Sequence, residues 1–148
     1  MSTGIPPMRE VDFMILKEDW SRYLLHDGTE LRVRTVVRKI VEQGQPNPMG
    51  YPNFGLESIN AVSAIVPERL KRKPSTEILD VSKEKGQELK FTPRDELWQE
   101  YQTTTGFKVL VKPILTKVFV YEKYNGFGEP IYNAIVQPLI NVEKMSES

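Results

Sequence analysis

The sequence contains a second copy of part of itself. When residues 13–64 are placed on residues 91–142, with a constant shift of 78 and no gap, ten of 52 positions are identical. Unrelated stretches of ordinary composition share about three positions over such a length. The identical pairs are Phe13/Phe91, Glu18/Glu96, Trp20/Trp98, Tyr23/Tyr101, Gly28/Gly106, Val33/Val111, Lys39/Lys117, Asn47/Asn125, Gly50/Gly128 and Pro52/Pro130. We therefore expect two like units, and each candidate site can be tested for a counterpart in the other unit.

The repeated stretch has the pattern of β-strands. Between Glu30 and Val41, apolar residues alternate with arginines, which places them on opposite faces of an extended chain. Residues 43–51 are rich in Pro, Gly and Asn and predict a loop, and residues 107–124 repeat the long strand. Pro113 and Pro138 each predict a bulge or a sheet edge, because proline donates no ladder hydrogen bond. The sequence predicts an all-β fold of duplicated small units, barrel-like or sandwich-like, related by a pseudo-twofold axis.

The organisation follows from these boundaries. We expect a flexible N-terminus at 1–12, a first β unit at 13–66 and a charged linker at 67–90. A second β unit at 91–142 is expected to pack on the first, followed by a polar tail at 143–148. Twelve of the 24 linker residues are charged, and Ser75 could cap a short helix that ends near Lys85.

Composition excludes several classes of chemistry. The chain has no cysteine, so disulfides, thiolate catalysis and cysteine-based metal sites are excluded. Twenty basic and twenty acidic residues cancel, and binding to nucleic acid would need a local basic patch. The longest apolar runs are only a few residues, and the N-terminal residues lack the apolar stretch of a signal peptide. We expect a cytoplasmic protein with no membrane partner, and no sequence motif indicates a cofactor or a metal site.

One short run resembles a known type of strand. The residues from Asp27 to Arg34, Asp-Gly-Thr-Glu-Leu-Arg-Val-Arg, are similar to the second-strand region of Sm-like and SH3-like barrels. The resemblance implies a small barrel, and it assigns no functional residue.

Basic residues form the first candidate site. A strand face that carries arginines could follow the phosphates of a nucleic acid, but nearby glutamates could neutralise the same side chains. The candidate nucleic-acid-binding residues are Arg32, Arg34, Arg38, Lys39, Arg69, Lys71, Arg72, Lys73 and Lys112.

A loop that occurs in both units forms the second candidate. Asn, Gly and Pro at matched spacings are what a fixed turn requires, and this is our preferred interpretation. The apolar tip residues could instead anchor a partner or cover the core of each unit. The candidate interaction loops comprise Asn47, Met49, Gly50 and Pro52, with Asn125, Phe127, Gly128 and Pro130.

Three further features have a structural interpretation that we favour over a catalytic one. The Trp20/Tyr23 and Trp98/Tyr101 pairs are expected to fill the cores, because aromatic residues supply much of the buried area in small β units. Glu18 and Glu96 are expected to bond within their own units, although two facing carboxylates could do acid–base work. His26, the only histidine, precedes a turn and is expected to be an exposed turn residue.

The leading hypothesis is a non-enzymatic β-rich binding or scaffold module that forms a homo-oligomer through exposed strand edges. The alternative is a nucleic-acid-binding protein that uses the basic strand and the basic linker cluster. An enzyme would need a pocket between the units lined by Glu18, Glu96 or His26.

Overall fold

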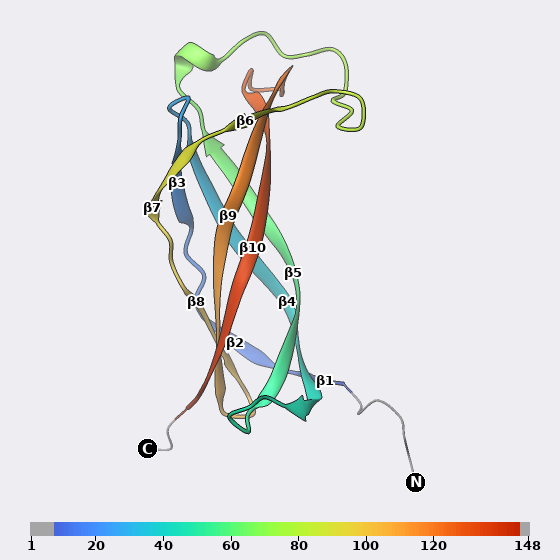
Figure 1. Ribbon diagram of the computed structural model, residues 1–148, viewed down its shortest axis with the longest axis vertical. Coiled ribbons are helices and arrows are strands. Elements are labelled where there is room, and N and C mark those ends of the chain that lie inside the picture. Colours follow the sequence, from blue (N-terminus) through green and yellow to red (C-terminus); the bar gives the residue numbers. More distant parts are fainter. Residues whose placement is uncertain (1–7, 146–148) are drawn as a thin grey trace.

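The computed structural model describes residues 8–145, which fold mainly into antiparallel β-strands (Figure 1). The body is elongated, and two long hairpins run along its length. The strands are β1 (Arg9–Val11), β2 (Phe13–Lys17), β3 (Ser21–Leu25), β4 (Glu30–Pro46), β5 (Pro52–Ile65), β6 (Gln87–Leu89), β7 (Phe91–Asp95), β8 (Gln99–Thr103), β9 (Phe107–Tyr124) and β10 (Pro130–Lys144).

Each sheet is built on one long hairpin. In the first sheet, β4 pairs with β5 along one side and with β1 and β3 along the other, and β7 pairs with β3. In the second sheet, β9 pairs with β10 along one side and with β6 and β8 along the other, and β2 pairs with β8. Consecutive short strands therefore alternate between the sheets, and each sheet takes one strand from the other half of the chain.

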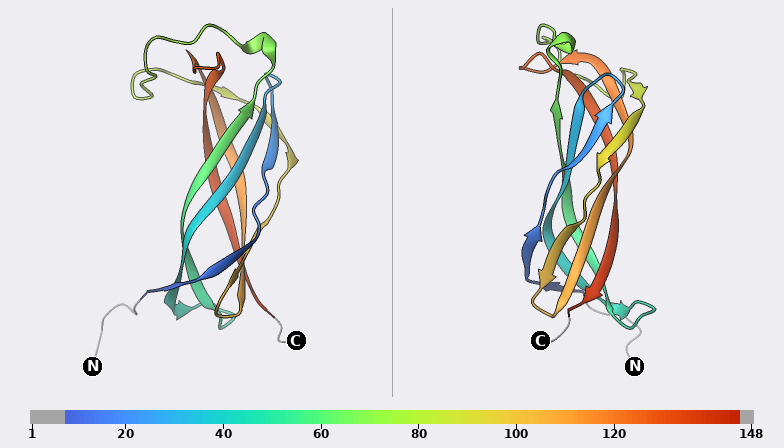
Figure 2. Two further views of the ribbon diagram at one scale, coloured as in Figure 1. Left: turned by 180° about the vertical axis from the view of Figure 1, so that it is seen from behind. Right: turned by 90° about the vertical axis from the view of Figure 1, so that its left-hand side faces the viewer.

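The elements of the two halves follow the same order. The shift of 78 that aligns the sequence also relates the bounds of β1 to those of β6, β2 to β7 and β3 to β8. The same shift relates β4 to β9 and β5 to β10 to within one residue at either end. Neither sheet is closed, so of the barrel-like and sandwich-like forms that the sequence predicts, a closed barrel is not found. The architecture is two open antiparallel sheets packed on each other, as Figure 2 shows from two further sides.

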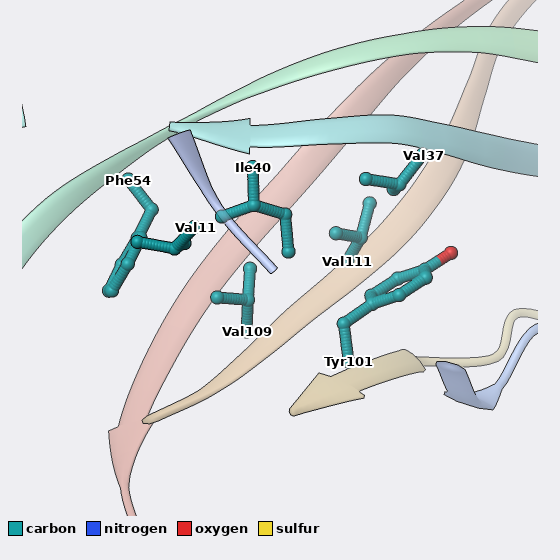
Figure 3. Close-up of a cluster of buried hydrophobic side chains, with 7 residues drawn as sticks. All are labelled: Val11, Val37, Ile40, Phe54, Tyr101, Val109 and Val111. Atoms are coloured by element: carbon teal, nitrogen blue, oxygen red, sulfur yellow. The ribbon is translucent and has the colours of Figure 1, made fainter. Parts of the chain in front are cut away.

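Two clusters of buried side chains form the core, and both sheets contribute to each. The cluster in Figure 3 joins four residues of the first sheet to Tyr101, Val109 and Val111 of the second. The other cluster joins four residues of the first sheet to Leu115 and Val118. The first sheet supplies Val11, Val37, Ile40 and Phe54 to one cluster, and Tyr23, Leu25, Leu31 and Val33 to the other. Because neither half could cover these side chains alone, the two halves form one body.

On the side away from its hairpin partner, each long strand lacks a strand neighbour at its midpoint within the described residues, and side chains of the opposite sheet fill these gaps. On β4, β3 pairs as far as Val33 and β1 begins at Ile40. Between them, Thr35 donates its N–H to Gln99 Oε1 (2.9 Å), and its carbonyl accepts from Gln99 Nε2 (2.6 Å). On β9, the Tyr23 hydroxyl accepts from the N–H of Leu115 (3.1 Å) and lies 3.3 Å from the carbonyl oxygen of Pro113. Pro113 therefore lies at a local edge, as its sequence predicts.

The connection between the halves, residues 67–86, crosses one end of the body, and we call it the strap (Figure 1). It contains one short 3-10 helix, η1 (Glu68–Leu70). The prediction of a helix between Ser75 and Lys85 is wrong, because these residues form bends, turns and irregular chain. Ser75 instead bonds to the C-terminal end of β9, where its Oγ accepts from the N–H of Tyr124 (2.8 Å). The strap is attached there and by the N–H of Arg72, which donates to the carbonyl of Gly128.

Candidate interaction surfaces

Acidic partners accompany most of the basic residues on β4. Arg34 pairs with Glu18 (3.8 Å), Arg38 with Glu57 (3.2 Å) and Lys39 with Glu10 (3.4 Å). Arg32 has no carboxylate partner among residues 8–145 and donates to Ser63 Oγ (2.8 Å). Three of the four basic side chains on the strand therefore have an acidic partner, and Arg32 is bonded to a hydroxyl.

The two tryptophans lie on the outer faces of the sheets, where cations cover them. The guanidinium carbons of Arg32 and Arg34 lie 5.1 and 4.6 Å from the centre of the Trp20 ring. Lys112 Nζ lies 5.5 Å from the centre of the Trp98 ring, which is the corresponding arrangement in the second half. The expectation that both tryptophans fill the core is wrong, since Trp98 remains 39% exposed. The paired tyrosines, Tyr23 and Tyr101, are fully buried as expected.

The basic cluster of the strap is held mainly by backbone carbonyls. Arg69 donates to the carbonyl of Asp27, and Arg72 Nη1 donates to the carbonyls of Arg69 and Lys71. Lys71 pairs with Glu68 (2.8 Å), and this bond raises the pKa of the lysine. Lys73 is exposed beside Glu77 and Glu122 in a shallow hollow of the surface. Within the cluster, the two lysines therefore lie near carboxylates, and the two arginines are bonded to backbone carbonyls.

The matched loops have the same hydrogen bonds. Asn47 Oδ1 accepts from the N–H groups of Met49 and Tyr51, and Asn125 Oδ1 accepts from those of Phe127 and Glu129. Gly50 and Gly128 have φ of 83° and 77°, a conformation that side chains disfavour. Pro52 and Pro130 begin the return strands β5 and β10. These bonds explain the motif as turn chemistry.

The tips of these loops point into solvent at opposite ends of the body. Met49 is 72% exposed and Phe127 is 82% exposed. The interpretation of the tips as covers for the core is therefore wrong. Their role as partner anchors stays a prediction.

The structure does not bring the candidate catalytic residues Glu18, Glu96 and His26 together in one site. The Glu96 carboxylate accepts from the hydroxyl of Tyr23 (2.7 Å), which belongs to the other half of the chain, so the expected bond within one unit is wrong for Glu96. Glu18 pairs with Arg34 of its own half, as expected. Burial and the neighbouring glutamates raise the pKa of both buried tyrosines. His26 is exposed at its turn, in a hollow that contains neither glutamate.

A cleft of about 540 Å³ lies beneath the strap, at one end of the body. Tyr121, Tyr124 and Leu89 form part of its wall, together with Arg72 and Glu84. Glu84 is also within 3.6 Å of Lys123. Because the wall of the cleft has both acidic and basic side chains, its charge does not favour either an anionic or a cationic ligand.

The long edge strands are almost free of charge. Within the described residues, β5 pairs only with β4, and β10 pairs only with β9. β5 has one charged residue among 14, Glu57, and β10 has two among 15, both at its C-terminal end. Six of 17 residues are charged in the interior strand β4, and five of 18 in β9. Charge therefore lies on the interior strands and is scarce on the edges.

A second contrast separates the short edge strands β2 and β7. β2 exposes Met14, Ile15 and Leu16 (60%, 55% and 42%). At the same positions of β7, the chain has Thr92, Pro93 and Arg94, all exposed. Sequence analysis did not select β2 as a candidate. Its signal was visible as an apolar run in which the residues at the aligned positions of the second half are polar or proline.

Neither a cluster of metal ligands nor a membrane-spanning helix occurs in the described part of the chain. Residues 8–145 contain no group of three or more histidine, aspartate or glutamate side chains arranged to hold a metal ion. No helix within the same residues is long and apolar enough to cross a membrane.

Comparison with known proteins does not place the chain in a group. No protein-family model matches it, and neither the curated proteins nor the solved structures contain a significant match. The assignment of a function therefore depends on the surfaces described above.

Proposed function

We propose that the protein is a non-enzymatic β-scaffold module that associates with further copies of itself through the free edges of β5 and β10. We further propose that its two halves are a duplicated unit, which provides each copy with two related edges. The observation that carries the proposal is the distribution of charge between interior and edge strands.

Free edges of soluble β-proteins usually carry charges, prolines or bulges that prevent pairing with another chain. In this protein, residues 58–65 of β5 contain no charge and no proline. β10 has no charge before Glu143, and Pro138 is the one proline in its interior. Unpaired backbone groups on an uncharged edge favour the addition of another strand. The edges therefore have the composition of strands that are covered in an assembly.

Apolar side chains on these edges support the same proposal. Ile59 and Ile65 of β5 and Ile135 and Leu139 of β10 are exposed. Strand pairing between copies would bring such side chains beside those of a neighbour, and the removal of apolar surface from water would add to the backbone hydrogen bonds. Edges of 14 and 15 residues also match each other in length.

Two edges on each copy determine the form of the assembly. A copy that uses only one edge can form a dimer, whereas a copy that uses both can join two neighbours. We therefore expect species larger than dimers at high concentration, unless the contacts close into a ring.

Sedimentation velocity over a range of protein concentrations tests the proposal. The edge variant combines Ile59→Lys, Ile65→Lys, Ile135→Lys and Leu139→Lys, which all replace exposed side chains. We expect the wild-type mass to rise with concentration and the edge variant to stay at the monomer mass of 17.1 kDa. Ile78→Lys is the matched control because Ile78 is 94% exposed on the strap, away from both edges, and it should behave as wild type.

Two variants with only one altered edge sharpen the experiment. Ile59→Lys with Ile65→Lys, or Ile135→Lys with Leu139→Lys, should restrict the protein to dimers if each edge pairs with its own kind. If β5 pairs with β10 of the neighbouring molecule, either double variant alone should abolish the association and leave a monomer. A wild-type protein that remains monomeric at the highest concentration would refute the proposal.

A further inference from the structure

The edge strand β2 differs from its counterpart β7 in a way that the fold does not require. Both strands have five residues, occupy aligned positions, have a shift of register at the fourth residue and pair with one neighbour, β8 or β3, within the described residues. β7 carries Pro93, Arg94 and Asp95, which are residues that protect an edge from pairing. β2 carries three exposed apolar residues in succession. Since β7 shows that a protected sequence can occupy this place, the apolar sequence of β2 requires another explanation.

We infer that β2 binds a short extended peptide segment of another protein, which adds to the second sheet as a further strand. The backbone groups on the free side of β2 would hold the peptide, and Met14, Ile15 and Leu16 would contact its apolar side chains. Peptide recognition by strand addition uses these two components, main-chain hydrogen bonds and side-chain contacts. The surface is separate from the edges of β5 and β10.

The strand is fixed in place on its other side, so it is ready to receive a partner. The ring of Phe13 packs edge-on against the buried ring of Tyr101, with 5.8 Å between ring centres. At the other end of the strand, Lys17 Nζ lies 3.4 Å from the carboxylate of Glu100. Binding to an ordered strand costs less conformational entropy than binding to a flexible one.

The size of this surface favours a peptide over a second copy of the protein. Five residues of extended chain span roughly 17 Å. Stable interfaces between folded proteins usually bury about 1,200 Å² or more, which a single strand of this length does not provide. A hollow of about 340 Å³ lies over the paired strands β2 and β8, where Phe13, Met14 and Gln102 form part of its wall. A short peptide needs only the free side of β2 and its three exposed apolar side chains.

The duplicated arrangement supplies matched variants. The protected variant carries Met14→Thr, Ile15→Pro and Leu16→Arg, which gives β2 the residues of β7. Proline is compatible with this position, because Pro93 faces Tyr23 in the same register in which Ile15 faces Tyr101. The reverse variant carries Thr92→Met, Pro93→Ile and Arg94→Leu, which gives β7 the residues of β2. Circular dichroism would verify that each variant is folded.

The test begins from the edge variant, so that association through β5 and β10 does not interfere. A phage-displayed library of random octapeptides is selected on this protein and, in parallel, on the same protein with the protected β2. We expect enrichment of peptides with several apolar residues only on the unprotected β2. A synthetic copy of an enriched peptide, followed by fluorescence anisotropy, should bind about tenfold or more weakly to the protected variant. The reverse variant should bind two peptides per chain.

Other outcomes would overturn the inference. Equal enrichment on the protected and unprotected proteins, or no enrichment on either, would remove β2 as a peptide site. A dimer of the edge variant that disappears when β2 is protected would show that a second copy occupies this edge. Failure of the self-association proposal would appear instead as a monomeric wild-type protein, whatever the result with peptides.

Discussion

At the scale of single residues, the midpoint of β4 depends on one side-chain amide. Gln99 donates to the carbonyl of Thr35 and accepts from its N–H, and it also donates to the hydroxyl of Tyr101 (2.6 Å). All three residues are buried. The amide therefore replaces the neighbouring strand that β4 lacks at this point, and it satisfies backbone groups that water does not reach.

Substitution of this glutamine is expected to lower stability. Gln99→Leu retains the approximate size of the side chain but leaves the N–H of Thr35 without its partner and its carbonyl with only the longer bond from the Tyr101 hydroxyl (3.3 Å), which should cost about 1–3 kcal/mol of the free energy of unfolding. Urea denaturation measures this change. Gln45→Leu, at an exposed position, is the control and should change the free energy by less than about 0.5 kcal/mol. A stability equal to wild type would show that Thr35 finds another partner.

At the scale of elements, the outer face of β4 combines cations with an aromatic ring, as nucleic-acid-binding strands do. Here the cations are already engaged, because Glu18, Glu57 and Glu10 neutralise three of them and Trp20 lies under two. A phosphate backbone would have to displace these carboxylates before it could bind.

We therefore expect little affinity of β4 for nucleic acid. Titration of random-sequence RNA and DNA at low salt, followed by fluorescence anisotropy, should show no binding that decreases steeply with salt. Glu10→Gln with Glu57→Gln, which releases Lys39 and Arg38, should increase any residual binding. The alternative function would regain support from salt-dependent affinity that is lost in the variant Arg32→Ala, Arg34→Ala and Arg38→Ala.

The elements also show what the sequence can and cannot predict. The alternation in residues 30–41 and the loop motif at Asn47 and Asn125 predict strands and turns correctly, because strand faces and turn conformations depend on nearby residues. The alternation of β1, β2 and β3 between the sheets was not predictable in this way, since nothing in five consecutive residues specifies a distant partner. The same limit applies to the tryptophans. Size and repetition suggested a core position, but packing placed Trp20 against arginines on the outside.

At the scale of the whole molecule, two buried tyrosines connect stability to pH. Burial raises the pKa of Tyr23 and Tyr101 above the ordinary value of 10.0. Above pH 10 the unfolded chain loses these protons while the folded protein retains them, so stability is complete below pH 10 and decreases as the pH rises further. Lysines also begin to lose their charge in this range, which makes a variant necessary to separate the effects.

We expect the urea midpoint to decrease between pH 9 and pH 12, and Tyr101→Phe to reduce the slope of this decrease. Tyr101→Phe also removes a hydroxyl that bonds Gln99 and Thr35, so its stability at neutral pH should be lower than that of wild type. The informative quantity is the slope rather than the absolute value. An identical pH dependence in both proteins would mean that other groups control the alkaline transition.

The alternation of short strands between the sheets also has a mechanical consequence. The chain passes from one sheet to the other between β1 and β2, between β2 and β3, and again at the two corresponding places in the second half. A shearing force on the two layers would have to break ladders of hydrogen bonds and could not simply slide one apolar surface over the other. The body should therefore resist deformation as a single rod, with no weak plane along its length.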